Sequence, residues 1–177
     1  FNDLYRKGYG YRSGVNQTMR THLKGITQQL LSEVLLTEND TVLDIASNDG
    51  TLLKSYENPN INLIGIDPTI EQYKAYYPKK NVYLSSDFFS KEVFHSISPT
   101  KYAKLISSIA VFYDVPDPNL FANDIASILD KEGVWVMEQS YLPLLIKDLS
   151  FDSICHEHLA YYGFKQIKLA AESANLR

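Results

Sequence analysis

The sequence lacks several features that define whole classes of protein. Among its 177 residues there is one cysteine, Cys155, so no disulfide can form within the chain and we expect a reducing compartment, the cytoplasm. No apolar run is long enough to cross a bilayer, and no signal peptide is recognisable. A formal net charge of -4 supplies no basic excess for nucleic acid or an acidic membrane surface. We therefore predict neither nucleic acid nor a membrane as a partner.

The composition suits one α/β domain with many aromatic side chains. Hydrophobic residues make up 45% of the chain, which is enough to build a core. The 13 tyrosines include tight clusters, and tyrosine combines a rigid apolar ring with a polar end. Such clusters can line a pocket for a polar ligand, or they can be ordinary half-buried surface residues.

Short apolar runs alternate with segments of helical periodicity. The predicted strands are 41–45, 61–66, 82–84, 104–111 and 133–138, and the predicted helices are 13–36, 51–56, 70–76, 118–129 and 164–174. Residues 1–12, rich in Tyr and Gly, are expected to be irregular, and Asn119 and Asp124 to lie on the polar face of their helix. This alternation predicts an α/β fold, a Rossmann-like, doubly wound and mostly parallel sheet.

Polar residues follow three predicted strands, at the edge where a doubly wound sheet binds ligands. Asp44 ends the first strand, Asp67 ends the second, and Asp87 and Phe88 follow the third. The second aspartate can accept hydrogen bonds from ribose hydroxyls, while the third can bind an adenine amino group beside a packed phenyl ring. Each aspartate alone could be a turn or cap residue. Their common position at strand ends favours a cofactor that contains a nucleoside.

The loop after the first strand separates two classes of cofactor. A dinucleotide site needs G-x-G-x-x-G, whereas residues 46–50 read Ala-Ser-Asn-Asp-Gly, and we expect the single Gly50 to let a ligand approach the backbone. Carboxylates repel a pyrophosphate but suit a cationic ligand with an amino-acid end, which describes S-adenosyl-L-methionine. The predicted cofactor contacts are Asp44, Ala46, Ser47, Asn48, Asp49, Gly50, Asp67, Pro68, Asp87, Phe88 and Ser107.

Three motifs resemble the sugar C-methyltransferase family: VLDIASNDGTLL at 42–53, GIDP at 65–68 and CHEHLAYY at 155–162. Residues 9–14 and 19–22 are similar to the part of that family that lies over the cofactor. The resemblance implies methylation of a nucleotide-linked 4-keto deoxysugar at carbon 3, with S-adenosyl-L-homocysteine as the second product. It also implies a small-molecule substrate, a nucleotide sugar, and a protein that is a monomer or a weak homodimer.

The same resemblance implies a class I methyltransferase core that lacks its final strand pair. It divides the chain into a Tyr-rich segment and helix that cover the cofactor, residues 1–36, and a core that binds S-adenosyl-L-methionine, residues 37–177.

The resemblance further implies which residues carry the chemistry. Transfer of a methyl group to carbon needs an enolate, which forms when a base removes a proton next to a ketone and the resulting oxygen anion is stabilised. His158 would be the base, and Glu157 would orient it or bind sugar hydroxyls. Tyr9 or Tyr11 would donate a hydrogen bond to the sugar or to the enolate oxygen.

Other interpretations of the last motif stay open. His156 and His158 could bind a metal ion together with Cys155, but neighbouring residues rarely converge on one ion, so we predict no metal. The motif could instead be a polar helix cap. The methyl acceptor could be an oxygen or nitrogen of a small metabolite, or the chain could be a non-catalytic binding module. The family pattern often has a histidine after the fourth strand, where this chain has Asp114.

Overall fold

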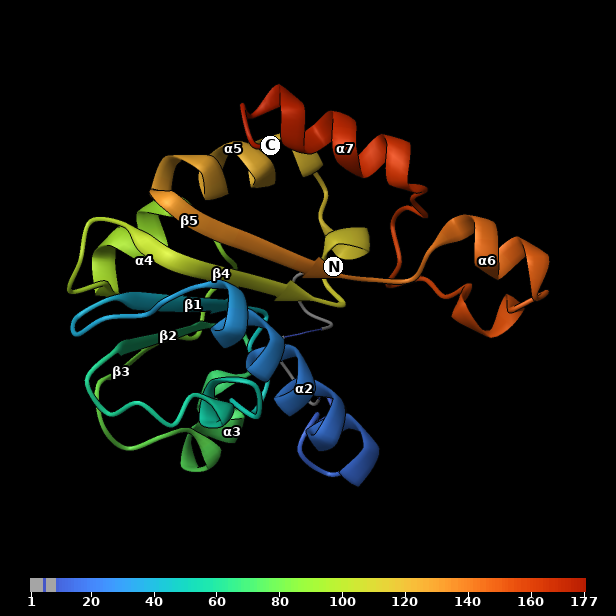
Figure 1. Ribbon diagram of the computed structural model, residues 1–177. Helices are drawn as coiled ribbons and strands as arrows, with labels where there is room; N and C mark the ends of the chain where they lie inside the picture. The colour runs from blue at the N-terminus through green and yellow to red at the C-terminus, as the bar shows by residue number, and fades with distance from the viewer. Residues whose placement is uncertain (1–4, 6–8) are drawn as a thin grey trace.

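Five apolar segments pair side by side in one parallel sheet in the computed structural model, which describes residue 5 and residues 9–177 (Figure 1). The order across the sheet is β3-β2-β1-β4-β5, and every neighbouring pair is parallel. The strands are β1 (Thr41–Ile45), β2 (Asn62–Ile66), β3 (Val82–Ser85), β4 (Ala103–Ile109) and β5 (Leu129–Glu138). The predicted α/β fold with a doubly wound parallel sheet is thereby confirmed.

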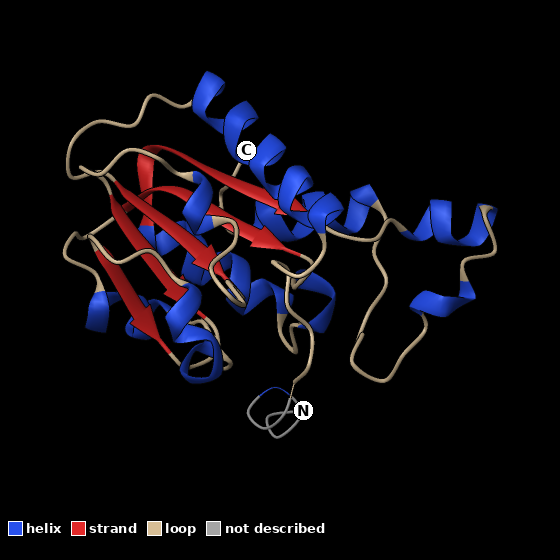
Figure 2. Ribbon diagram, turned by 90° about the horizontal axis from the view of Figure 1, so that it is seen from below, coloured by secondary structure: helices blue, strands red, loops and turns tan. Residues whose placement is uncertain are grey.

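Helices cover both faces of this sheet (Figure 2). They are α2 (Gln17–Glu33), α3 (Ile70–Tyr73), α4 (Lys91–Ile97), α5 (Pro118–Ile128), α6 (Leu142–Lys147) and α7 (Phe164–Ser173). The described part of the chain also contains four single turns of 3-10 helix: η1 (Leu53–Ser55), η2 (Lys74–Tyr76), η3 (Phe112–Asp114) and η4 (Phe151–Ser153). In Figure 1, α2 and α3 lie along one side of the sheet and α5 and α7 along the other.

Neighbouring residues of a strand point to opposite faces, so each central strand must be apolar on both sides. On one face Val42 packs in a core with residues of α2, η1 and α3. On the other face Leu43 packs in a second core with residues of α4, α5 and α7. Both side chains are 0% exposed. The two cores pack against the strands from both faces, and the parallel pairing brings the carboxyl ends of the strands to one edge.

The structure corrects several predicted boundaries. The first helix begins at Gln17 rather than at residue 13, because the Asn16 side chain accepts from the backbone N–H of Thr18 at 2.8 Å and caps it. The predicted helix 51–56 shrinks to the turn η1, and 70–76 divides into α3 and η2. Helices α4 and α6 were not predicted, and β5 starts four residues earlier than expected. Of the expected irregular segment, residues 1–4 and 6–8 lie outside the described residues, while 9–12 have no regular structure.

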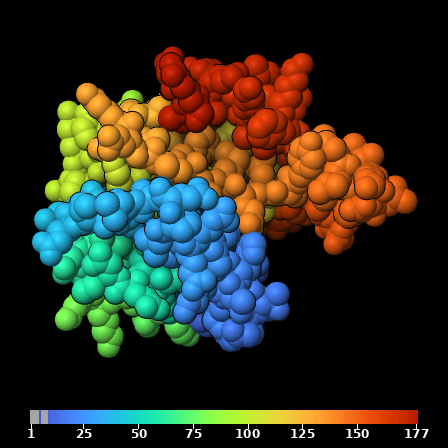
Figure 3. All heavy atoms as spheres, viewed as in Figure 1, coloured from blue at the N-terminus to red at the C-terminus, as the bar shows by residue number. Residues whose placement is uncertain are grey.

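Two further features differ from the sequence expectation. Asp124 is 6% exposed rather than on a polar face, because it accepts from the backbone N–H of Lys91 at the start of α4. The segment with α6 and η4 projects from the body of the protein (Figure 3). Within the described part of the chain, no helix is long and apolar enough to span a membrane.

Alanine substitutions at two glycines, Gly25 and Gly50, should change the free energy of unfolding in opposite directions. Gly25 is exposed in the middle of α2, and an added Cβ would meet nothing within 4 Å. Gly25→Ala should raise the free energy of unfolding by about 0.5–1 kcal/mol, because alanine loses less backbone entropy in a helix. Gly50 has φ +71 and a Cβ there would lie 2.6 Å from the Tyr77 ring. Gly50→Ala should lower the same free energy by about 2 kcal/mol or more.

Urea unfolding of the two variants, followed by circular dichroism, measures both effects. The interpretation of Gly50 is contradicted if Gly50→Ala unfolds at the same urea concentration as the unmodified chain.

Candidate functional site

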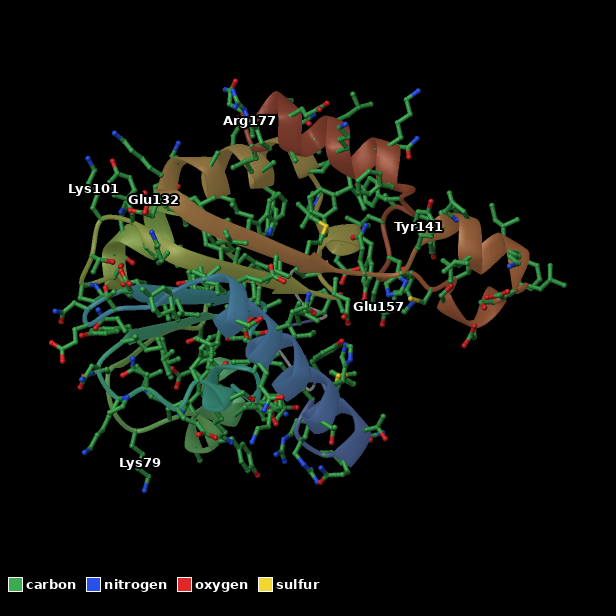
Figure 4. The ribbon with its side chains drawn as sticks, in the orientation of Figure 1. Lys79, Lys101, Glu132, Tyr141, Glu157 and Arg177 are labelled. Carbon is green, nitrogen blue, oxygen red and sulfur yellow. The ribbon has the colours of Figure 1, made fainter. Side chains whose placement is uncertain are left out.

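A cavity of about 610 Å³ opens at the carboxyl edge of the sheet. Its lining comes from the ends of β1, β2 and β4, from residues before α2, from residues 113–116, and from Cys155, Glu157 and His158. The strand order changes direction between β1 and β4, which is where doubly wound sheets bind ligands. Figure 4 places Glu157 at this edge and Lys101 and Glu132 at the opposite one.

Most predicted site residues line this one cavity. Those that do are Tyr9, Tyr11, Asp44, Ala46, Ser47, Asn48, Asp67, Pro68, Asp87, Phe88, Glu157 and His158. The lining does not include Asp49, Gly50 or Ser107, which lie behind it.

Asp44 is a buried carboxylate at the end of β1. It is 4% exposed, and the Ser107 hydroxyl on β4 donates to its Oδ1 at 2.6 Å. Burial raises the pKa of Asp44 to about 7, the hydrogen bond from Ser107 lowers it in part, and the charge of Asp67 raises it further. Ser107 thus reaches the cavity only through Asp44, and a cation in the cavity would favour the ionised carboxylate.

Asp67 organises the end of β2. Its Oδ1 accepts from the backbone N–H of Thr69 at 2.6 Å and from the Thr69 hydroxyl at 2.5 Å. Its Oδ2 accepts from the backbone N–H of Asn48 at 2.9 Å. Each carboxylate oxygen has two lone pairs, so Oδ2 keeps the capacity to accept from a ligand hydroxyl. Asp67 therefore fixes the loop after β1 and faces the cavity as well.

The loop after β1 is built from alternating left-handed residues. Ala46, Asn48 and Gly50 have φ values of 59, 50 and 71. Tyr77 supports this loop from behind, since its hydroxyl donates to the Asn48 carbonyl at 2.8 Å and lies 2.7 Å from Ser47 Oγ. Gly50 is needed because the Tyr77 ring occupies the place of a Cβ. The expected reason, close approach of a ligand, is thus replaced by close approach of a tyrosine ring.

Residues 9–16, which we call the strap, cross the cavity next to this loop. The Tyr73 hydroxyl donates to the Tyr9 carbonyl at 2.7 Å. The Arg12 guanidinium lies 3.7 Å from the centre of the Tyr76 ring. Tyr9 and Tyr11 line the cavity, although Tyr11 is 50% exposed.

His158 has a fixed orientation at the other end of the cavity. Its Nδ1 lies 2.8 Å from the Ser153 carbonyl, and its ring centre lies 4.2 Å from that of Tyr113. A carbonyl oxygen can only accept, so Nδ1 carries the proton and Nε2 of the neutral ring carries the lone pair. The backbone N–H groups of Leu159 and Ala160 both donate to the Tyr113 carbonyl, at 2.9 and 3.1 Å. These contacts seat the CHEHLAYY motif against η3.

Two groups at this end were not predicted as site residues from the sequence, Tyr5 and Tyr113. They line it together with Asp114, and the Tyr5 hydroxyl donates to Asp114 Oδ2 at 3.1 Å. Burial, followed by the charge of Asp114, raises the pKa of Tyr5, Tyr9 and Tyr113, so all three phenols stay hydrogen-bond donors at neutral pH. The available signals were the place of Tyr5 in the Tyr-rich opening segment and that of Tyr113 in η3, shortly after β4.

The neighbouring groups of the motif are arranged differently from His158. The His156 side chain is 80% exposed and is not part of the cavity lining. The Glu157 side chain is 28% exposed and lines the cavity. The hydrogen bond from Cys155 lowers the pKa of Glu157, and that carboxylate stays ionised. Across residue 5 and residues 9–177, no three His, Cys, Asp or Glu side chains are grouped as a metal site requires.

Several known proteins share this fold. A chain of the complex between the Trm112 methyltransferase activator of Haloferax volcanii and a methyltransferase superposes with a TM-score of 0.68 at 17% identity, over 89% of this chain and 70% of the other. A SAM-dependent methyltransferase from Archaeoglobus fulgidus superposes with a TM-score of 0.67 at 21% identity, over 89% of this chain and 69% of the other. At these identities the likeness concerns the fold, a Rossmann-like class I methyltransferase fold.

Comparison of the sequence with known proteins shows the family to which the chain belongs. The C-methyltransferase NovU of Streptomyces niveus is 26% identical over 171 residues, which are 96% of this chain. The chain spans only 40% of the length of that curated relative. Residues 16–177 match a family described as a methyltransferase domain. Because this match covers nearly the whole sequence and the fold agrees with it, the chain belongs to the methyltransferase domain family.

Proposed function

We propose that this chain is the core of an enzyme that methylates a carbon atom of a nucleotide-linked keto-deoxysugar. One observation carries the proposal: His158, with its lone pair on Nε2, shares a cavity with the buried carboxylates Asp44 and Asp67. A base and a cation-binding end in one cavity suit methyl transfer to a carbon acid. The likeness to a C-methyltransferase supports carbon as the acceptor.

S-adenosyl-L-methionine is the cofactor, and the residues at the strand ends fit it. A cavity of about 610 Å³ is in the range of small-molecule sites. Asp67 would bind the ribose hydroxyls, Asp87 the adenine amino group, and Phe88 would pack on the base. The loop residues 46–48 would hold the amino-acid end, near the carboxylate of Asp44. Three further residues would act indirectly by supporting this end: Asp49, Gly50 and Ser107.

The opposite end of the cavity would bind the sugar. When bound, S-adenosyl-L-methionine supplies an electrophilic methyl group on a sulfonium sulfur. Nε2 of His158 would accept the proton from the carbon next to the ketone, and the C–H electron pair would pass into the enolate. A phenol, Tyr9 or Tyr11, would donate to the enolate oxygen, and Glu157 would accept from a sugar hydroxyl. His158, Glu157 and a phenol would thus prepare the sugar carbon, while the residues at the strand ends would hold the cofactor that supplies its methyl group.

The first part of the chain would serve as a cover. Met19 and Leu23 of α2 line the cavity together with the strap. Of the predicted cover, residues 1–36, the described residues 5 and 9–36 would therefore close the site over the cofactor, and residues 37–177 would supply its floor.

The test of the base is His158→Gln, with His156→Gln as the matched control. Glutamine keeps a polar side chain of similar size but cannot accept the carbon-bound proton. With nucleotide-linked 4-keto deoxysugars as acceptors, His158→Gln should lower the turnover by about 10²- to 10⁴-fold. The affinity for S-adenosyl-L-homocysteine, measured by calorimetry, should stay within about twofold, because His158 is not among the proposed cofactor contacts. The exposed His156 should tolerate the change.

A second measurement separates the base from the methyl transfer. Without cofactor, the unmodified chain should exchange the carbon-bound hydrogen next to the ketone for solvent deuterium, and His158→Gln should not. Equal exchange by both proteins would contradict the assignment of His158. Methylation of an oxygen or nitrogen acceptor, with no activity on the sugars, would contradict carbon as the acceptor.

Burial of Asp44 predicts how stability depends on pH. Its pKa in the folded chain, about 7, exceeds that of the unfolded chain, so the folded state binds the proton more tightly. The stabilisation is complete below about pH 4 and is lost as the pH rises towards 7. Asp44→Asn should flatten this part of the profile, because asparagine does not ionise and its oxygen can still accept from Ser107.

Thermal unfolding between about pH 4 and pH 8 measures this dependence. The exposed Asp152→Asn is the control and should keep the fall in melting temperature. A profile of Asp44→Asn that is parallel to that of the unmodified chain would show that Asp44 is not the titrating group.

A further inference from the structure

The side chains of Asn48 and Asp49 point to the strap. The Asn48 side chain binds the strap backbone twice: its Nδ2 donates to the Tyr11 carbonyl at 3.0 Å, and its Oδ1 accepts from the Ser13 N–H at 3.0 Å. Asp49 Oδ2 accepts from the Gly14 N–H at 3.1 Å and from Arg12 Nε at 3.2 Å. These four hydrogen bonds tie four successive strap residues to the loop after β1.

We propose that Asn48 and Asp49 are positioning residues that hold the strap over the cavity and couple its closure to the cofactor at Asp67. Hydrogen bonds of both side chains go to the strap, although Asn48 also lines the cavity and Asp49 does not. The inference rests on the cofactor half of the proposed function, and it assigns Asn48 and Asp49 a task that the loop sequence alone does not reveal.

The backbone of Asn48 is pinned from two sides. Its N–H donates to Asp67 Oδ2 at 2.9 Å, and its carbonyl accepts from the Tyr77 hydroxyl at 2.8 Å. With φ 50, this residue is in the left-handed region, which asparagine tolerates better than most residues. The direction of the Asn48 side-chain amide is thus fixed. The amide donates one hydrogen bond to the strap backbone and accepts one from it. A ligand that holds the Asp67 carboxylate in place would therefore also hold Asn48, which is bonded to it, and the Tyr11 carbonyl, which is bonded to Asn48.

Asp49 requires the strap for its own burial. It is 1% exposed, and a buried carboxylate is costly unless it is paired and hydrogen-bonded. Its Oδ1 is satisfied locally by the N–H and hydroxyl of Thr51, while Oδ2 depends on Gly14 and Arg12. Release of the strap would leave Oδ2 without these two donors. The closed strap is therefore favoured by the loop itself.

The close contact also explains a glycine in the strap. A Cβ on Gly14 would lie 2.6 Å from Asp49 Oδ2 and 2.7 Å from Thr51 Oγ1. Any side chain at this position would push the strap away from the loop. The contact can therefore be broken from either partner, by Asn48→Gly in the loop or by Gly14→Ala in the strap.

The experiment compares these two variants with Asn81→Gly. Asn48→Gly keeps the left-handed backbone but removes both side-chain hydrogen bonds. Asn81 has φ 49 and donates from Nδ2 to the Pro59 carbonyl at 2.8 Å, on the surface and outside the cavity lining. Asn81→Gly thus removes a comparable hydrogen bond from a comparable backbone. It controls for the general effect of the substitution on stability.

The first measurement is amide hydrogen exchange at Ser13 and Gly14, followed by NMR with and without S-adenosyl-L-homocysteine. Asn48→Gly and Gly14→Ala should speed exchange of the strap amides about tenfold, the effect of roughly 1.4 kcal/mol in hydrogen bonding. Exchange at residue 14 is compared after correction for the intrinsic rate of alanine. In the unmodified chain the ligand should slow these amides further, and in Asn48→Gly this slowing should be lost.

The second measurement is the dissociation rate of S-adenosyl-L-homocysteine, which should rise about tenfold in both variants and stay unchanged in Asn81→Gly. Strap exchange at the unmodified rate in Asn48→Gly would overturn the inference, as would an equal rise in dissociation in Asn81→Gly. A loosened strap with an unchanged dissociation rate would overturn the coupling to the cofactor. If the unmodified chain binds no S-adenosyl-L-homocysteine, the proposed function fails, while exchange without ligand still decides whether Asn48 holds the strap.

Discussion

The hydrogen bond of 2.6 Å from Ser107 to Asp44 joins β4 to β1 where the order of the strands changes direction. The two residues are aligned in the sheet register, so the bond follows from the strand pairing itself. It lets a carboxylate remain at the centre of a sheet that is apolar on both faces. Burial raises the pKa of Asp44 to about 7, so the ionised form is costly there. A site of this kind gives up stability in exchange for a negative group that a cationic ligand can stabilise.

The fold could be predicted because its strongest signals are local. β1, β2 and β4 are short apolar runs, since each is buried on both faces, and such runs separated by helical periodicity have few alternative arrangements. The helices α4 and α6 have only 7 and 6 residues, too few to show a period clearly. Asp124 could not be placed from its helix, because its partner Lys91 is supplied by another element.

The site could be predicted in part for the same reason. Asp44 and Asp67 stand at strand ends, and parallel strands bring their carboxyl ends to one edge whatever the rest of the chain does. The tasks of Asp49 and Gly50 depend on Gly14 and Tyr77, which are distant in sequence. A loop motif indicates where a ligand binds, but it does not show which of its side chains face the ligand and which hold another segment.

Asp114 places a carboxylate near His158, the proposed base, at a position where a histidine could supply no negative charge. Burial raises the pKa of Asp114 to about 6, while the hydrogen bond from Tyr5 and the charge of His158 lower it in part. Above that pH the carboxylate is ionised near His158. If His158 acts as the proposed base, the proton from carbon would make it an imidazolium, which a nearby carboxylate stabilises and a protonated histidine would oppose. As the pH rises through about 6, Asp114 therefore becomes the ionised neighbour that such an imidazolium requires.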